Sequence, residues 1–328
     1  MLTSPLISLG LLILGLGILV KSANWLVSGS SSIAKKWGIS SLVIGLTVVS
    51  FGTSAPEFLV NLISAFHGNT DLAIGNIIGS NTANILLILG ITTIITPLAV
   101  KKNTTFKEIP FAMLAAVLVI LFGNDSFFDG NSFNAITRTD GFAFLALFVI
   151  FLYYTYGISK IKGEKEHIDE YSWITSMGLA LGGIIGLTIG GELIVRHASN
   201  LAVYAGLSDR IIGLTIVAIG TSLPELATSV VAAMNKKADL AIGNIVGSNI
   251  FNVFWILGIT SIIKPIPFNA SINVDAIFSA FAALLLFIAV IIGKHRIEKW
   301  HGYVFFFLYL GYLGFLVIAP ECLPLYCK

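Results

Sequence analysis

Charged residues are scarce in this chain of 328 residues, because Asp, Glu, Lys and Arg together make up only 11% of it. A soluble domain carries roughly 25% charged residues, so this composition excludes a water-facing surface over most of the chain. The formal net charge of +2 gives no sign of a nucleic-acid partner, and we expect none. Cysteine is nearly absent: Cys322 and Cys327 lie in the terminal tail, where a disulfide and two idle thiols are both open.

What the chain has in abundance is hydrophobic residues, which make up 56% of it. They form runs of about 20 residues, each long enough to cross a bilayer core of about 30 Å as a helix. The first run is not expected to be a secretory signal, since no basic segment precedes it and further runs follow. Polar and Gly/Pro breakers divide the chain into ten expected spans, at residues 6–28, 40–66, 71–96, 108–124, 141–158, 173–198, 210–233, 239–263, 274–293 and 302–319. The sequence therefore predicts an all-α membrane protein that crosses the lipid bilayer repeatedly.

Basic residues divide unevenly between the two sides of these spans. If the N-terminus lies outside, the inner segments hold 13 of the 19 Lys and Arg residues and the outer segments hold five. Because loops rich in Lys and Arg stay in the cytoplasm, both termini are predicted to face away from it. We expect a multi-pass protein of the cell (inner) membrane.

Three segments of the first half recur in the second half. Each lies 168 residues before its copy, and the pairs are Ile44–Thr47 with Ile212–Thr215, Gly52–Glu57 with Gly220–Glu225, and Ala73–Asn81 with Ala241–Asn249. A fixed offset predicts structurally equivalent halves. Each half holds five expected spans, so the second half crosses the membrane in the opposite sense. We predict two inverted five-helix repeats, residues 1–158 and 173–328, joined by a cytoplasmic linker at 159–172, an architecture typical of secondary transporters.

The repeated GTSxPE segments place Glu57 and Glu225 deep inside apolar runs. A carboxylate at the centre of a membrane helix costs about 2.5–3.5 kcal/mol on insertion scales. No Lys or Arg lies at that depth apart from Lys21, near the end of the first expected span. A bound cation is the simplest compensation for two such carboxylates.

The same segments supply further oxygen ligands. Pro56 and Pro224 lack an N–H, so the carbonyl oxygen four residues earlier loses its helical partner. Hydroxyl groups come from Thr53, Ser54, Thr221 and Ser222. Ca²⁺ takes six to eight oxygen ligands at about 2.3–2.6 Å, whereas the missing soft and imidazole ligands argue against zinc or copper. The segments predict a calcium site.

Further polar residues follow in the third repeated segment. An i,i+4 spacing places two side chains on one helix face, and the pairs are Ser80 with Asn84 and Ser248 with Asn252. Asn81 and Asn249 are interpreted as hydrogen-bonding residues between helices, not as direct ligands. GxxxG pairs allow close helix approach, and they are Gly75 with Gly79 and Gly243 with Gly247.

The first half contains GTSAPE followed by GNIIGSNTAN, and the second half contains GTSLPE followed by GNIVGSNIFN. In these two segments the chain resembles the two alpha-repeats of the cation/calcium antiporter superfamily, and above all those of its prokaryotic Na⁺/Ca²⁺ exchanger branch. The resemblance covers essentially the whole chain. It implies a central diamond of Glu57, Asn84, Glu225 and Asn252, with Ca²⁺ held mainly by the glutamates and by carbonyl oxygens of Thr53 and Thr221. It implies sodium sites at the same glutamates with Ser54, Ser222, Ser80, Ser248 and the carbonyl oxygens of Ser50 and Ala218. Some relatives carry Asp where this chain has Asn252, so two negative charges are expected here.

The function implied is secondary active antiport of Ca²⁺ against Na⁺ by alternating access, with the first and sixth spans sliding against the other eight. The protein is expected to be no enzyme, to need no cofactor and to work as a monomer. The rival is H⁺/Ca²⁺ exchange through the same two glutamates, although hydroxyl ligands favour sodium because protons do not use them. A cation channel and an intramembrane hydrolase fit less well.

Overall fold

The computed structural model describes residues 4–128, 130, 133–159, 170–206, 216 and 218–322. The first half contains helices, π-helical segments (η) and short strands in this order: α1 (Pro5–Trp37), α2 (Ser41–Ile44), η1 (Gly45–Val49), α3 (Ser50–Thr53), α4 (Ala55–His67), α5 (Thr70–Ala83), η2 (Asn84–Ile88), α6 (Leu89–Ile95), β1 (Leu98–Ala99), η3 (Thr104–Glu108), α7 (Ile109–Gly123), α8 (Asp125–Phe128), β2 (Ala135–Ile136) and α9 (Arg138–Ser159). The second half contains α10 (Trp173–Tyr204), α12 (Ala218–Gly220), α13 (Leu223–Met234), α14 (Ala238–Ile250), η5 (Phe251–Leu257), α15 (Gly258–Ile263), β3 (Ile266–Pro267), α16 (Ala270–Ile292), β4 (Arg296–Ile297) and α17 (Lys299–Cys322). Most of the predicted linker, the repeated segment Ile212–Thr215 and Cys327 lie outside the described residues.

Seven helical stretches in the described part of the chain are long and apolar enough to cross a membrane, or eight if the bent pair Ser41–Thr53 and Ala55–His67 is one span. These eight coincide with eight of the ten expected spans. The expected span 210–233 lies partly outside the described residues and otherwise contains the shorter apolar helix α13. The expected span 302–319 falls within α17. The chain is a mostly helical multi-pass membrane protein, while the count of ten and the inverted orientation remain predictions.

Two details of the sequence-based map were wrong. Helix α1 continues to Trp37, beyond the expected end at residue 28, so Lys35 and Lys36 lie in its last turn and not in a loop. The chain also contains two short antiparallel strand pairs that the sequence did not predict, β1 with β4 and β2 with β3, in a fold that is otherwise helical. Helices α6 and α15 each end at an extended residue before proline, Thr96 and Lys264, because proline disfavours the helical conformation of the preceding residue.

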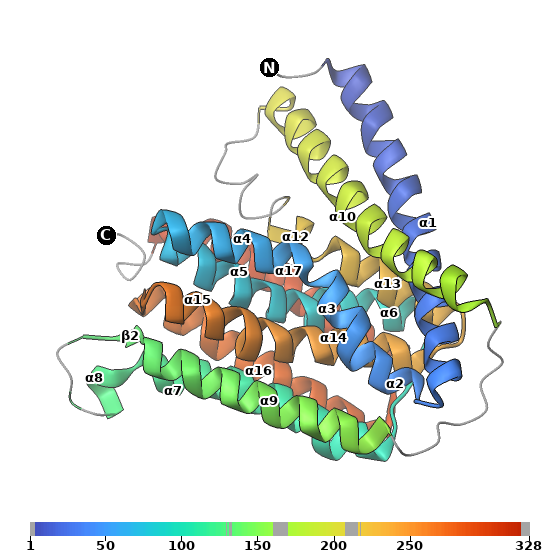
Figure 1. The fold of residues 1–328 in the computed structure, drawn as a ribbon. Helices are drawn as coiled ribbons and strands as arrows, with labels where there is room; N and C mark the ends of the chain where they lie inside the picture. Colours follow the sequence, from blue (N-terminus) through green and yellow to red (C-terminus); the bar gives the residue numbers. More distant parts are fainter. Residues whose placement is uncertain are drawn as a thin grey trace.

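Helices α1 and α10 lie side by side as a pair that projects from the other helices (Figure 1). Glycines allow their backbones to come close. A Cβ added at Gly29 would lie 2.6 Å from both the amide nitrogen of Ala180 and the carbonyl oxygen of Ser176. A Cβ added at Gly183 would lie 2.6 Å from the amide nitrogen of Leu26. The two helices are therefore packed backbone to backbone over much of their length.

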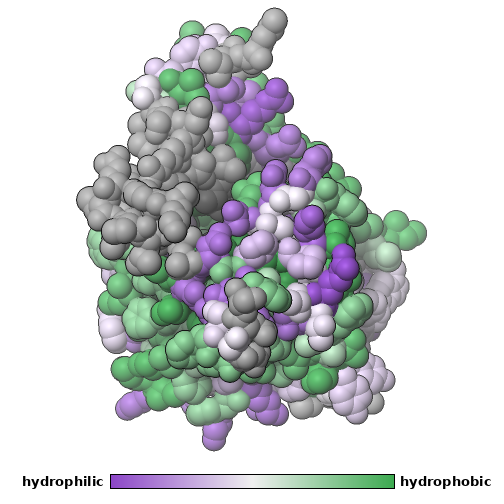
Figure 2. Space-filling model, turned by 90° about the vertical axis from the view of Figure 1, so that its left-hand side faces the viewer, coloured by the Kyte–Doolittle hydropathy of each residue, from purple (hydrophilic) through white to green (hydrophobic). Residues whose placement is uncertain are grey.

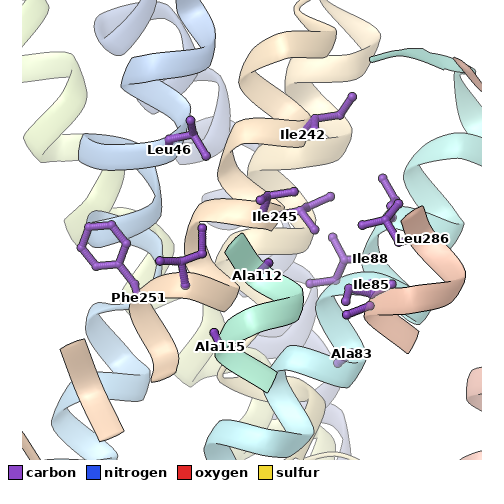
Figure 3. Close-up of a cluster of buried hydrophobic side chains, with 14 of the residues drawn as sticks. Leu46, Ala83, Ile85, Ile88, Ala112, Ala115, Ile242, Ile245, Phe251 and Leu286 are labelled. Carbon is purple, nitrogen blue, oxygen red and sulfur yellow. The ribbon is translucent and has the colours of Figure 1, made fainter. Parts of the chain in front are cut away.

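The remaining helices share a core to which both halves of the chain contribute. Leu46 of η1, Ile85 and Ile88 of η2 and Ala112 of α7 lie near Ile245 and Phe251 of the second half (Figure 3). Inside a bilayer such contacts stabilise the bundle through close van der Waals packing and not through the removal of side chains from water. The core thus joins the two halves around the helix breaks between α3 and α4 and between α12 and α13.

The GxxxG pairs differ in how much of their surroundings the structure describes: Leu42 and Leu46 lie against the second pair, whereas the equivalent positions 210 and 214, which would face the first pair, lie outside the described residues. A Cβ at Gly243 would lie 2.8 Å from the carbonyl oxygen of Leu42, and one at Gly247 would lie 2.9 Å from that of Leu46. The predicted close packing is therefore confirmed for the second pair. For Gly75 and Gly79, no atom of the described residues lies within 4 Å of an added Cβ, so close packing is not shown there.

Figure 2 views the end of the molecule at which α4 and α15 finish. Hydrophilic side chains gather near the centre of this face, and hydrophobic ones surround them over much of its flanks. Such a distribution suits a bundle whose sides contact lipid and whose ends contact water.

We expect Gly29→Ala to destabilise the α1–α10 pair, because the new methyl group meets backbone atoms that cannot move alone. Overpacking of this kind costs about 1–3 kcal/mol, which lowers the unfolding temperature by several degrees. The matched control is Gly17→Ala on the same helix, where an added Cβ has no described atom within 4 Å. Thermal unfolding in detergent measures both variants, and an equal midpoint for the two would contradict this packing.

Candidate ion-binding site

The two GTSxPE segments fold in the same way. Helix α3 ends at Thr53 and α4 begins at Ala55, with a bend of 47° between the two arms. At the junction, Ser54 has φ −83° and ψ 10°, and Ser222 has φ −90° and ψ 5°. A proline stands in the first turn of α4 and of α13, where its missing N–H costs no helical hydrogen bond. Each break places a glutamate in the first turn of the following helix, at Glu57 and Glu225.

The four residues of the expected diamond are almost fully buried. Glu57, Asn84, Glu225 and Asn252 are each 1% exposed. No ion pair between described residues includes either glutamate, so none of the described basic side chains neutralises the site.

Serine and threonine hydroxyls connect the two halves across the site. Ser54 Oγ donates to Glu225 Oε1 at 2.9 Å, and Ser222 Oγ donates to Glu57 Oε1 at 3.3 Å. The two contacts are equivalent under the 168-residue offset. Each glutamate is therefore held by the hydroxyl that belongs to the other half of the chain.

A second reciprocal pair involves asparagines that the sequence left unassigned. Thr53 Oγ1 donates to Asn244 Oδ1 at 3.1 Å, and Thr221 Oγ1 donates to Asn76 Oδ1 at 3.3 Å. These contacts tie each helix break to the α5 or α14 helix of the other half. The threonine side chains thus hold the breaks in place, while their carbonyl oxygens remain the predicted ligands.

Four buried oxygens of the site have no hydrogen-bond partner among the described residues, namely Glu57 Oε2, Glu225 Oε2, Asn84 Oδ1 and Asn252 Oδ1. An unpaired buried polar atom costs about 1–3 kcal/mol, and more when it is charged. The four atoms are one from each residue of the diamond, and all are oxygen. A hard cation is the ligand that such a donor set fits.

The remaining predicted ligands lie around this centre in different ways. Ser248 Oγ lies 3.4 Å from Glu225 Oε1, and Ser80 Oγ lies 3.2 Å from Ser222 Oγ. Ala218 begins α12, one turn before Thr221. Ser50 differs, because its carbonyl oxygen accepts the N–H of Ser54 at 3.0 Å and its hydroxyl bonds the carbonyl oxygen of Gly45 at 2.6 Å. The Ser50 hydroxyl also lies 3.0 Å from the carbonyl oxygen of Asn244 in α14, so Ser50 is engaged both within its own helix and with the other half of the chain.

Sequence reasoning missed the π-helical geometry beside the site. The η2 segment begins at Asn84, and Asn252 is the second residue of η5. Widened turns of this kind recur at functional sites. No periodicity in the apolar residues signals them, because a single extra residue per turn changes the pattern too little to recognise.

A third buried carboxyl group was also missed. Glu108 is fully buried at the end of η3, and the Tyr154 hydroxyl of α9 donates to its Oε1. Glu108 is the first residue of the expected span 108–124 and belongs to none of the repeated segments, so no sequence signal points to it. Its Oε2 has no partner among the described residues.

Known proteins resemble this chain over nearly its whole length. The family model described as sodium/calcium exchanger protein matches residues 7–157 and 175–318. The chain belongs to the sodium/calcium exchanger family. The two matched blocks fall in the two predicted repeats, and the family is one of membrane antiporters that carry Ca²⁺.

Individual relatives cover nearly the whole chain. The sodium/calcium exchanger MaX1 of Methanosarcina acetivorans is 29% identical over 343 aligned residues, covering 94% of this chain and 97% of its own. The inner membrane protein YrbG of Escherichia coli K12 is 34% identical over 303 residues, covering 85% of this chain and 89% of its own. A solved structure of the sodium-calcium exchanger NCX_Mj, soaked with zero Na⁺ and Ca²⁺, superposes with a TM-score of 0.82 at 34% identity, covering 95% of this chain and 100% of the other.

We expect Glu57→Gln and Glu225→Gln each to weaken Ca²⁺ binding at least tenfold, since each removes one of two charges that face the cation. A loss of about 1.4 kcal/mol already gives a factor of ten. Equilibrium binding of ⁴⁵Ca²⁺ to the purified protein in detergent measures the change. The matched control is Glu108→Gln, a buried carboxyl group outside the diamond, which should bind Ca²⁺ as the wild type does. Similar losses in all three variants would contradict this site.

Proposed function

We propose that this protein is a secondary active antiporter that exchanges Ca²⁺ for Na⁺ across the cell membrane by alternating access. The single observation that supports it most is the set of four unpartnered buried oxygens, two of them from carboxylates. A transported cation, and not a resident cofactor, is the substrate that this site fits.

The charge of the site supplies a reason for obligatory exchange. Glu57 and Glu225 together neutralise one Ca²⁺, or they are shared among several Na⁺ ions. An empty site would carry two negative charges through a low-dielectric bundle, which costs several kcal/mol. The carrier therefore changes its open side only when it is loaded, and one ion returns in exchange for the other.

Sodium is favoured over protons as the counter-ion by the hydroxyl groups around the glutamates. Ser54, Ser222 and Ser248 lie within 3.4 Å of a glutamate oxygen, and Ser80 lies beside Ser222. Hydroxyl oxygens are ligands for Na⁺ and are not needed by a carboxylate that binds a proton. The names of MaX1 and NCX_Mj as sodium/calcium exchangers support the same choice. The alternative is H⁺/Ca²⁺ exchange through the same two glutamates.

The moving part we propose is the α1–α10 pair, which slides against the other helices. The pair packs through closely apposed backbones and projects from the rest of the bundle (Figure 1). An inverted-repeat architecture would place equivalent gates on the two sides of one midplane site. One chain holds all the proposed ligands, so we propose that it works as a monomer in the inner membrane with both termini outside the cytoplasm.

The deciding measurement of counter-ion is ⁴⁵Ca²⁺ uptake into proteoliposomes. In the first experiment, buffer and ionophore hold the pH equal on both sides, and an outward Na⁺ gradient should drive Ca²⁺ uptake. In the second experiment, a pH gradient is imposed without Na⁺, and it should not drive uptake. Uptake driven by the pH gradient alone would support the H⁺/Ca²⁺ alternative. Flux that needs no counter-ion on the opposite side would instead indicate a channel. Glu57→Gln and Glu225→Gln proteoliposomes should lose the uptake, and near-normal exchange in either would reject the assignment.

The orientation has a separate test. A thiol reagent that cannot cross the membrane should label Cys322 and Cys327 in intact cells if the C-terminus faces away from the cytoplasm. The control is Lys102→Cys in a chain whose two native cysteines are changed to Ser, since this residue lies in a predicted inner segment. Labelling of Lys102→Cys, but not of the native cysteines, would reverse the predicted orientation.

A further inference from the structure

The two amide ligands of the proposed site raise a question that the two carboxylates do not. A carboxylate offers oxygen in either rotamer, whereas an asparagine amide carries one acceptor oxygen and one nitrogen with two donors. Rotation of the amide by half a turn would point N–H groups at a cation and repel it. Something must fix the orientation of Asn84 and Asn252 for both to serve as ligands.

The structure contains a hydrogen-bond partner that fixes each of them. Asn84 Nδ2 donates to Asn249 Oδ1 at 2.9 Å, and Asn252 Nδ2 donates to Asn81 Oδ1 at 3.0 Å. Both contacts cross from one half of the chain to the other and are equivalent under the 168-residue offset. With the nitrogen engaged, the oxygen of each amide is left without a partner, as found for Asn84 Oδ1 and Asn252 Oδ1.

The partner amides are themselves fixed, by the backbone. Asn81 Nδ2 donates to the carbonyl oxygen of Asn249 at 3.3 Å, and Asn249 Nδ2 donates to that of Asn81 at 3.3 Å. These side chains are only 5% and 3% exposed, so water does not compete for the contacts. Because their nitrogens bind backbone oxygen, their own Oδ1 atoms must face the neighbouring amides. The orientation is thus transmitted from backbone to Asn81 and Asn249, and from them to the site.

We propose that Asn81 and Asn249 are positioning residues: Asn81 holds the amide oxygen of Asn252 towards the ion, and Asn249 holds that of Asn84. The proposal rests on the cation site of the proposed function and extends it to two residues that contribute no ligand of their own. Helix packing alone would require the backbone contacts but not the bonds to Asn84 and Asn252.

A double-mutant cycle separates positioning from packing. Asn81→Leu removes the acceptor for Asn252 at similar size, and we expect it to raise the Kd for Ca²⁺ roughly fivefold, as loss of one net hydrogen bond implies. In an Asn252→Asp background, the carboxylate needs no orientation, so the same change should raise the Kd less than about twofold. A purely structural role for Asn81 gives equal effects in both backgrounds and would overturn the proposal.

The other half of the chain provides the matched control. Asn249→Leu should weaken binding in both the wild-type and the Asn252→Asp backgrounds, because Asn249 orients Asn84. Asn249→Leu should lose its effect on the Kd for Ca²⁺ only in an Asn84→Asp background. In that same background, Asn81→Leu should still raise the Kd. The proposal would be overturned if an Asp substitution removed the effect of the leucine variant in the other pair, where the pairs are Asn81 with Asn252 and Asn249 with Asn84.

The readout is equilibrium ⁴⁵Ca²⁺ binding to the purified protein without Na⁺ or a gradient, with thermal unfolding in the absence of Ca²⁺ to verify folding. If a leucine variant does not fold, Asn81→Ala and Asn249→Ala replace it in the same cycle. Binding in the wild type without Na⁺-driven flux would refute sodium coupling and leave the cycle decisive for the positioning residues. A wild-type protein that binds no Ca²⁺ would overturn both proposals.

Discussion

Two carboxylates with no basic partner among the described residues lie inside an apolar bundle, and they constrain the rest of this molecule. The ion pairs between described residues lie elsewhere: Lys35 with Glu170, Lys101 with Asp239, and Arg296 with Glu298. A Lys or Arg beside Glu57 and Glu225 would neutralise the site permanently, and the chain would then have no use for a mobile cation. Its absence keeps the buried charge dependent on an ion that enters and leaves.

Neither half of the chain completes the site alone. Ser54 bonds the glutamate of the second half, Ser222 bonds that of the first, and each diamond asparagine is held by an asparagine of the opposite half. The hydrophobic core in Figure 3 and the two strand pairs join the same halves. A change at either helix break therefore affects the ligands of both halves together, which is the property that a carrier with one shared site needs.

The sequence predicted the residues of the site better than their contacts. Glu57 and Glu225 could be recognised because an acid within an apolar run is costly and because both recur at one offset. The hydrogen-bond partners of Asn81 and Ser50 could not be predicted, since they depend on how α14 packs against α5 and α3 and on which amide atom faces which neighbour. The π-helical turn at Asn84 and the short strand β1 depend likewise on local backbone geometry that residue types alone do not reveal.

The site divides its work between two kinds of ligand. Carboxylates supply charge and cannot present the wrong atom, but they must be neutralised before they cross a low-dielectric region. Amides add oxygen without adding charge, so a site of two acids and two amides is neutral with one Ca²⁺ bound. An amide does not titrate over the physiological range, but rotation by half a turn would replace its oxygen ligand by an NH₂ group. The bound cation neutralises the two carboxylates. The buried side chains of Asn81 and Asn249 serve the two amide ligands in a corresponding way, because they fix which amide atom faces the cation. If Asp replaced Asn252, Asn81 would have no amide to orient, and if Asp replaced Asn84, the same would hold for Asn249. In either case the site loaded with one Ca²⁺ would keep a net negative charge.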